Sequence, residues 1–263
     1  MASAYPILQA QQHHATRFGK VALAVMSKAP RPGKVKTRLA PPLTLEQSAA
    51  LNTCFLRDTT ANIAQVAGQG SADGIVCYTP VGDEAAFDGL LPGGFSLIPQ
   101  RGDAFGERLH CAATDLLSCG YSAVCLIDSD SPTLPQEALT SAVAALLQPG
   151  DRVVLGGSDD GGYYLVGLKQ AHAQVFERIT WSTGSVFQET CERTREAGLD
   201  LVELPVWYDV DDGATLRVLA AELLDGTAPA FARAEGYDAE ATRAFLQSLV
   251  AAGAPWRPAP VAS

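Results

Sequence analysis

The chain has 263 residues, of which 47% are hydrophobic, and its 19 basic and 29 acidic residues give a formal net charge of −10. This length is enough for one domain with a sizeable core, and the acidic balance argues against nucleic acid as a partner, because nucleic-acid-binding proteins usually present a basic face. The apolar runs are too short to cross a bilayer and the N-terminus lacks the layout of a secretory signal, so we expect a cytoplasmic protein without membrane insertion.

Strand and helix signals alternate through the first half of the chain. Residues 1–18 show little periodicity and are expected to form a flexible leader. Thr44 and Gln47 have the spacing of a capping box, which predicts the start of a helix. Further strands are predicted near 21–26, 74–78, 95–98 and 123–127, and helices near 82–90, 104–118 and 135–147. The alternation predicts an α/β fold with a central, mostly parallel sheet flanked by helices.

The pattern changes after Gly150. Strands near 153–155 and 163–168 are joined directly by a Gly-rich segment, so at least one strand is predicted to run antiparallel. Helices are predicted near 171–178, 185–197, from Asp212 and near 238–251, with a strand at 201–204. We therefore predict one domain over residues 19–226, followed by a C-terminal helix and an Ala/Pro-rich tail over 227–263. The six cysteines form no C-x-x-C pair and imply neither zinc nor disulfides.

Basic residues cluster directly after the first predicted strand. The cluster consists of Lys28, Arg31, Lys34, Lys36 and Arg38. In an acidic protein this indicates a local anion site. It is not a Walker A loop, because the Gly-Lys-Ser/Thr spacing is absent. Gly33 would let backbone amides approach an anion, while Lys and Arg supply charge and paired donors. We interpret the segment as a phosphate-binding loop; a solvated basic loop is the alternative.

Two acidic segments follow later predicted strands. Asp128 and Asp130 come after strand 123–127, and Asp209 and Asp211 after strand 201–204. Ligands of open sheets bind beyond the carboxyl ends of strands, and Mg²⁺ or Mn²⁺ prefers carboxylate oxygens. Without a cation, two such segments would repel each other. We therefore expect a shared divalent metal. A helix-capping Asp/Ser/Pro turn after strand 123–127 is the alternative, and Asp212 is a candidate helix cap.

A Gly-rich hairpin provides a candidate substrate site. Gly161 and Gly162 permit close approach of a substrate, Asp160 is a candidate base or sugar-hydroxyl acceptor, and Tyr163 or Tyr164 is a candidate stacking surface. A plain hairpin turn with two core tyrosines is the alternative.

Two further positions add candidate contacts. Trp181 offers either an aromatic wall or core packing. Gly102 and Asp103 follow strand 95–98 and suit a nucleotide- or acceptor-binding loop, although Asp103 is also a candidate cap for the next helix.

Five segments occur in the order found in a known family. They are Lys28 to Leu39, Ile127-Asp-Ser-Asp-Ser-Pro132, Asp160-Gly-Gly-Tyr-Tyr-Leu165, Trp181-Ser-Thr183 and Asp209-Val-Asp211. They resemble the radical-SAM/selenodomain-associated, or arsenosugar-type, transferases over about residues 20–220. That family is similar in turn to 2-phospholactate guanylyltransferase and the molybdenum-cofactor nucleotidyltransferases.

The resemblance implies the nucleotide-diphospho-sugar transferase fold, called glycosyltransferase A, with a metal-binding Asp-x-Asp. By this likeness, donor phosphates are bound by Lys28, Lys36 and Arg38. Mg²⁺ or Mn²⁺ is bound by Asp130, with Asp128 as a second ligand and Asp211 closing the shell. In much of the family, a glycine stands at the position of Asp128.

Two reactions fit this scaffold. A glycosyltransferase would pass the sugar of a nucleotide sugar to a small-molecule acceptor. A guanylyl- or cytidylyltransferase would instead release pyrophosphate from a nucleoside triphosphate. Both depend on metal and basic side chains. We favour sugar transfer, with Asp130 and Asp160 as the catalytic residues; a non-catalytic nucleotide-binding protein is the third hypothesis, because a fold does not fix a function.

Overall fold

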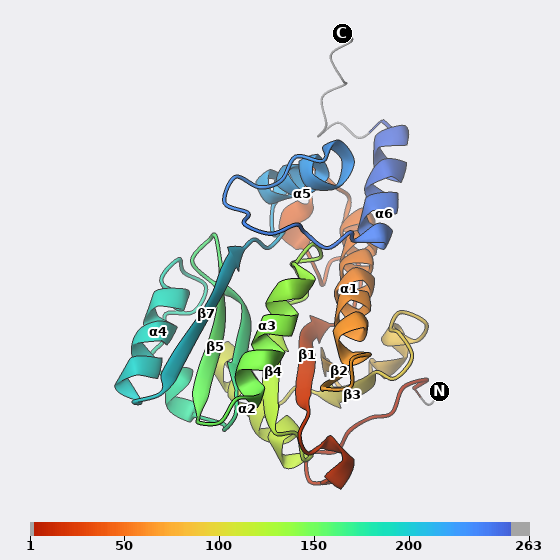
Figure 1. The fold of residues 1–263 in the computed structure, drawn as a ribbon. Coiled ribbons are helices and arrows are strands. Elements are labelled where there is room, and N and C mark those ends of the chain that lie inside the picture. Colours follow the sequence, from red (N-terminus) through yellow and green to blue (C-terminus); the bar gives the residue numbers. More distant parts are fainter. Residues whose placement is uncertain (1–2, 254–263) are drawn as a thin grey trace.

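The computed structural model describes residues 3–253 and contains a seven-stranded sheet between layers of helices (Figure 1). The strands are β1 (Val21–Lys28), β2 (Ala72–Thr79), β3 (Ser96–Pro99), β4 (Ala123–Ile127), β5 (Arg152–Ser158), β6 (Tyr163–Leu168) and β7 (Asp200–Trp207). Their order is β3-β2-β1-β4-β6-β5-β7. Only β6 runs antiparallel to its neighbours, β4 and β5, within the described residues. The predicted α/β fold with a mostly parallel mixed sheet is confirmed.

The two faces of the sheet belong to separate cores. On β1, Leu23 and Val25 pack into one core, whereas Ala22 and Ala24 pack into the other. The first core includes side chains of α1 (Leu45–Ala67) and α3 (Gln136–Leu147), and the second those of α2 (Phe105–Ser118) and α4 (Val186–Glu196). Coverage on both faces explains why β1 is apolar throughout.

The capping signals mark the starts of two helices. At α1, Thr44 Oγ1 accepts a hydrogen bond from Gln47 N at 3.1 Å, and Gln47 Oε1 accepts one from Thr44 N at 2.8 Å. At α5 (Gly213–Asp225), Asp212 caps the helix as expected, accepting from two backbone amides. At α2, the carboxylate of Glu107, and not that of Asp103, accepts from the entering backbone.

Two predicted helices are wrong. Residues 82–90 and 171–178 contain only the short 3₁₀ turns η3 (Glu84–Phe87) and η4 (Ala173–Val175). In the first segment, Gly82 and Gly89 adopt φ of 94° and 71°, and in the second Arg178 adopts 56°. Left-handed residues thus bound the first segment on both sides, and the second lies between the extended His172 and the left-handed Arg178, which leaves too few residues for a regular α-helix.

The N-terminal segment lies along the edge of the sheet. Leu97 of β3 donates to Pro6 O at 2.8 Å, and Leu8 N donates to Leu97 O at 2.7 Å. The Tyr5 hydroxyl also donates to Leu91 O at 2.8 Å. Residues 3–18, expected as a leader, thus contain little regular structure beyond η1 (Ala15–Arg17) but are hydrogen-bonded to the domain.

The C-terminal helix α6 (Glu240–Ala251) packs against α1 (Figure 1). The predicted Ala/Pro-rich end falls largely on residues 254–263, which lie outside the described residues. Between residues 3 and 253, no helix has the length and apolar character needed to span a bilayer.

Candidate functional site

Two adjoining cavities open where the loops after β1, β4, β5 and β7 meet the segment before α4. The larger, of about 420 Å³, is lined by five aspartates and is here called the acidic cavity: Asp128, Asp130, Asp160, Asp209 and Asp211. The smaller, of about 270 Å³, is here called the basic cavity and is lined by Lys28, Lys34, Lys36 and Arg38. Both cavities share Arg38, Asp130 and Asp211. The predicted phosphate loop and the predicted acidic segments therefore lie side by side.

The two acidic segments are joined by their backbones and by one cation. Val210 N donates to Asp130 O at 2.9 Å, which connects the loop after β4 to the loop after β7. The Lys36 ammonium lies 2.9 Å from Asp130 Oδ1 and 2.8 Å from Asp211 Oδ1. It also donates to Val210 O at 2.8 Å. Side chains separated by more than 80 residues thus converge around a single positive charge.

Local structure holds Lys36 in this position. Its backbone is left-handed, with φ of 47°, at the start of the 3₁₀ turn η2 (Thr37–Leu39). The buried side chains of Val35 and Leu39 fix the loop on both sides. The Lys36 side chain is only 5% exposed. Burial alone would lower the pKa of its ammonium group, but the charges of Asp130 and Asp211 raise that pKa above its ordinary value.

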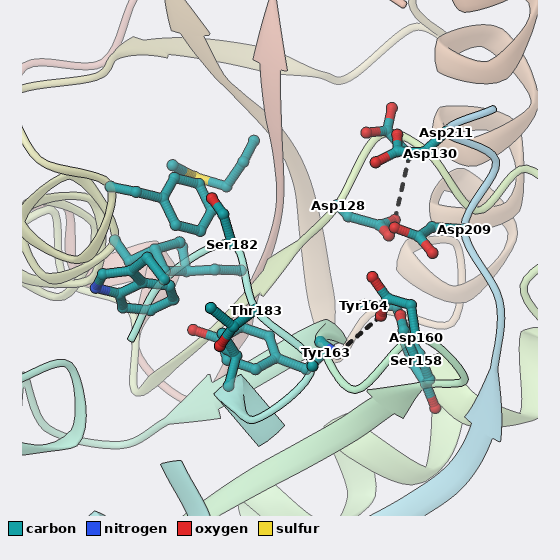
Figure 2. A pocket seen from close by; sticks show the side chains of 18 of the residues that line it. Asp128, Asp130, Ser158, Asp160, Tyr163, Tyr164, Ser182, Thr183, Asp209 and Asp211 are labelled. Atoms are coloured by element: carbon teal, nitrogen blue, oxygen red, sulfur yellow. Dashed lines mark hydrogen bonds between the residues drawn. The ribbon is translucent and has the colours of Figure 1, made fainter. Parts of the chain in front are cut away.

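Two further aspartates, Asp128 and Asp209, lie between this pair and Asp160 (Figure 2). Asp128 is held by Asp130 N and by the Ser131 hydroxyl, which donates to Oδ2 at 2.8 Å. Burial and the neighbouring charges of Asp130 and Asp209 raise the pKa of Asp128 well above its usual range. Burial, with repulsion from Asp160, Asp211 and Asp130, likewise raises the pKa of Asp209 to about 7. An excess of negative charge is therefore built into the site.

The donor set fits a hard divalent cation. Every candidate ligand is a carboxylate, the type that Mg²⁺ and Mn²⁺ prefer, and Asp130 and Asp211 already enclose a cation, the ammonium of Lys36. Within residues 3–253, no three acidic, His or Cys side chains are arranged as a ready set of metal ligands. Instead, the carboxylates of Asp130 and Asp211 both form ion pairs with the Lys36 ammonium.

The opposite side of the acidic cavity is aromatic. Trp181 meets Phe105 edge to face, with ring centroids 5.1 Å apart, and Tyr163 at 6.3 Å. Trp181 packs over the backbone of α2, since a β-carbon at Gly106 would lie 2.8 Å from its Nε1. Tyr163 faces the cavity, whereas Tyr164 is fully buried and donates to Pro205 O at 2.8 Å. Both predicted tyrosines therefore line the cavity, and Tyr164 also packs in the core.

A tight contact between two loops shapes this wall. Gly161 has φ of 89°, and a β-carbon there would lie 2.1 Å from the Gly184 carbonyl oxygen. Ser182 is left-handed, with φ of 65°, although it is not glycine. Figure 2 shows Ser182 and Thr183 across the cavity from the aspartates. Asp160 keeps the hairpin in shape by accepting from Gly162 N at 2.8 Å.

Some predicted residues lie outside these two cavities, and some lining residues were missed. Gly33, Gly102, Asp103 and Gly161 line neither cavity. Lining residues that were not predicted include Met26, Asn52, Phe105, Leu109 and Val186. Asp209 was predicted together with Asp211, and the two repeat the Asp-x-Asp spacing of Asp128 and Asp130.

Comparisons with known proteins identify relatives. Residues 62–183 match a family of uncharacterised proteins conserved in bacteria, DUF2064. A protein of Desulfovibrio desulfuricans G20, described provisionally as a nucleotide-diphospho-sugar transferase, is 31% identical over 88% of this chain and 95% of its own, with a TM-score of 0.72. CMP:2-keto-3-deoxy-manno-octonic acid synthetase in complex with CTP is 12% identical over 79% of this chain and all of its own (100%), with a TM-score of 0.51; this likeness concerns the fold alone. No curated protein matches the chain.

Proposed function

The chain belongs to the DUF2064 family and has the fold of nucleotide-diphospho-sugar transferases, and from this basis we propose that it is a metal-dependent glycosyltransferase acting on a small-molecule acceptor. The observation that carries the proposal is the convergence of Asp130 and Asp211 on one positive charge, at the border of a basic and an acidic cavity. A nucleotide-sugar donor has the matching layout, with a diphosphate next to an uncharged sugar.

The basic cavity is the proposed site for the donor phosphates. Lys28, Lys34 and Arg38 line it and supply ammonium and guanidinium donors. Lys36 is shared between this cavity and the aspartates, so it can exchange a carboxylate for a phosphate oxygen. The donor sugar then lies in the acidic cavity, where Arg38, Asp130 and Asp211 form the common border.

Asp130 and Asp211 are the proposed ligands of Mg²⁺ or Mn²⁺, with Asp128 beside them. The bound ion would supply positive charge for the departing nucleoside diphosphate. Asp160, on the same side of the cavity as the other aspartates, is the proposed acceptor of the proton of an attacking hydroxyl. One of its oxygens is fixed by Gly162 N, which orients the carboxylate towards the cavity.

Nucleotidyl transfer is the second candidate, and the basic cavity favours it. Its four cationic side chains would also suit a triphosphate. A nucleotidyltransferase whose acceptor is a phosphate, however, must bring that phosphate to the same centre. Within residues 3–253, five aspartates line the cavity available for that acceptor, and Arg38 is the one cation in its lining. Repulsion of a phosphate is the reason for preferring sugar transfer.

Donor turnover tests the proposal. The protein would be incubated with Mg²⁺ or Mn²⁺ and a panel of nucleotide sugars and nucleoside triphosphates. We expect release of nucleoside diphosphate from a nucleotide sugar, reduced by about 10²–10³-fold in Asp130→Asn, as when a charge-stabilising group is removed from other active sites. Asp200→Asn, which alters an exposed aspartate at the opposite end of β7, is the matched control and should keep full activity.

The same panel separates the alternatives. Release of pyrophosphate from a triphosphate would replace sugar transfer by nucleotidyl transfer. Binding of a nucleotide that persists in both Asp130→Asn and Asp211→Asn, with no turnover of any donor, would support the non-catalytic hypothesis instead.

A further inference from the structure

The acidic cavity has two chemically unlike sides. On one side stand the five aspartates; on the other stand apolar side chains contributed by β1, α2 and the loop before α4. The apolar lining on this side includes Met26, Phe105, Leu109, Trp181 and Val186, the first residue of α4. The hydroxyls of Ser182 and Thr183 lie on the cavity wall across from the aspartates (Figure 2). A ligand that fills this cavity meets carboxylates at one end and aromatic rings at the other.

The apolar side is fixed in place. Trp181 rests on Gly106 of α2, where any β-carbon would collide with its indole ring. Phe105, the first residue of α2, contacts Trp181 edge to face and is still 44% exposed. Ligand pockets are lined predominantly by hydrophobic and aromatic side chains, and Phe105 and Trp181 provide such a lining here. Rigid rings offer contact area with little loss of conformational freedom.

The charge of the cavity excludes anions. Among the described residues, Arg38 is the only cationic side chain in its lining, against five aspartates, and the exposed guanidinium of Arg38 is already 3.6 Å from Asp211 Oδ2. A phosphate or carboxylate on the ligand would lie close to several carboxylates. An uncharged molecule carries no such penalty, and a hydroxyl group can donate to a carboxylate oxygen.

We infer that the acceptor is an uncharged amphipathic alcohol, whose flat apolar part lies against Trp181 and Phe105 and whose hydroxyl faces the aspartates. This inference rests on the proposed function. It also limits size, because a cavity of about 420 Å³ must hold the donor's sugar together with the acceptor. A single ring bearing a hydroxyl on a short arm meets these conditions.

Transfer of the sugar to this acceptor is balanced in bonds, electrons and protons. The acceptor oxygen forms a bond to the anomeric carbon of the sugar. The bond from that carbon to the diphosphate oxygen breaks, and its electron pair leaves with the nucleoside diphosphate. The hydroxyl proton passes to the carboxylate of Asp160. The products are a neutral glycoside, a nucleoside diphosphate and one proton.

Ligand-detected NMR titrations of the full chain test the inference with three probes. These are 2-phenylethanol, glycerol, which lacks the ring, and 2-phenylethyl phosphate, which has the ring but carries charge. We expect 2-phenylethanol to bind at least about tenfold more tightly than either comparator. Phe105→Ala and Trp181→Ala should each weaken its binding by about tenfold, a loss typical of an aromatic contact. Phe18→Ala removes an aromatic ring that is 80% exposed outside the cavity lining and is the matched control.

Donor turnover by the wild-type protein is measured in parallel. If nucleoside diphosphate is released but 2-phenylethanol binds no better than glycerol or the phosphate ester, the inference is overturned and the proposed function stands. Unchanged binding in Phe105→Ala, a variant at an exposed helix end, would also overturn it. If the alcohol binds but no donor is ever turned over, the proposed function fails, and the inference fails with it.

Discussion

The ammonium group of Lys36 is the counter-ion of both acidic loops. Lys36 has three hydrogen-bond donors, and the structure gives it three acceptors, Asp130 Oδ1, Asp211 Oδ1 and Val210 O, at 2.8–2.9 Å. A lysine with a 5% exposed side chain is tolerated only when it is paired in this way. The side chain therefore links donor binding to the geometry of the proposed metal ligands.

Removing this ammonium should destabilise the metal-free protein. In Lys36→Met, two carboxylates lose their partner, and because Asp130 and Asp211 are 31% and 44% exposed, we expect a loss of about 1–3 kcal/mol, less than for a fully buried pair. Urea unfolding in EDTA measures it. Mn²⁺ should restore part of the loss, since a divalent ion can replace the ammonium. Lys34→Met, an exposed neighbour in the basic cavity, is the control. A variant as stable as the wild type would contradict this role.

The backbone conformation and surroundings of Gly161 leave no room for a side chain. Its left-handed φ of 89° and the 2.1 Å approach of a β-carbon to Gly184 O predict that Gly161→Ala costs about 2–3 kcal/mol and moves the wall that carries Ser182. The free energy of unfolding and the titration of 2-phenylethanol measure the two effects. Gly93→Ala has open space and no left-handed backbone, so it should change stability by less than about 0.5 kcal/mol. Equal stabilities of the two variants would refute the steric argument.

At the scale of elements, α6 is attached to the domain through α1. Asp58 of α1 is 4% exposed and accepts from Ala241 N at 3.0 Å and from Thr242 N at 2.7 Å, the first amides of α6. A carboxylate at a helix N-terminus satisfies donors that have no partner inside the helix. The C-terminal helix is therefore held by a contact between helices, in addition to its apolar face.

The pH dependence of stability reports on Asp58. Burial raises the pKa of its carboxyl above the ordinary 3.8, against the opposing hydrogen bonds from Thr242 and Ala241. The folded state thus binds this proton more tightly than the unfolded state does. Its contribution to stability is complete below about pH 4 and is lost as the pH rises through the raised pKa. The free energy of unfolding of the wild type, minus that of Asp58→Asn, should fall with increasing pH. A difference that grows instead would show the sign to be wrong.

The strands and most helices follow from local sequence patterns. β4 and β6 lie at the predicted residues, because apolar runs bounded by polar turns leave little choice of position. The acidic residues were found because they directly follow strands. The helices predicted at 82–90 and 171–178 were wrong, since tight left-handed turns there outweigh the apolar pattern. Phe105 and Val186 were not selected, because only the folded chain brings the starts of α2 and α4 to one cavity.

At the scale of the whole molecule, the fold concentrates negative charge in an already acidic protein. The net charge is −10, and five aspartates line one cavity. Folding therefore brings together carboxylates that would be far apart in the unfolded chain, and their repulsion opposes folding. A cation bound between them relieves this repulsion only in the folded state. The free energy of unfolding should therefore increase with the concentration of divalent ions.

Mn²⁺ or Mg²⁺ should accordingly raise the melting temperature measured in EDTA-treated protein. At a free ion concentration of 100 times the dissociation constant, binding to the folded state alone adds about 2.7 kcal/mol to the free energy of unfolding. Asp211→Asn should lose most of this increment, because the variant lacks one of the two carboxylates that meet at Lys36. Asp200→Asn, with the same change in net charge at an exposed site, should keep it. An equal shift in both variants would mean that the ion binds elsewhere, and the convergence of Asp130 and Asp211 would then have no role in metal binding.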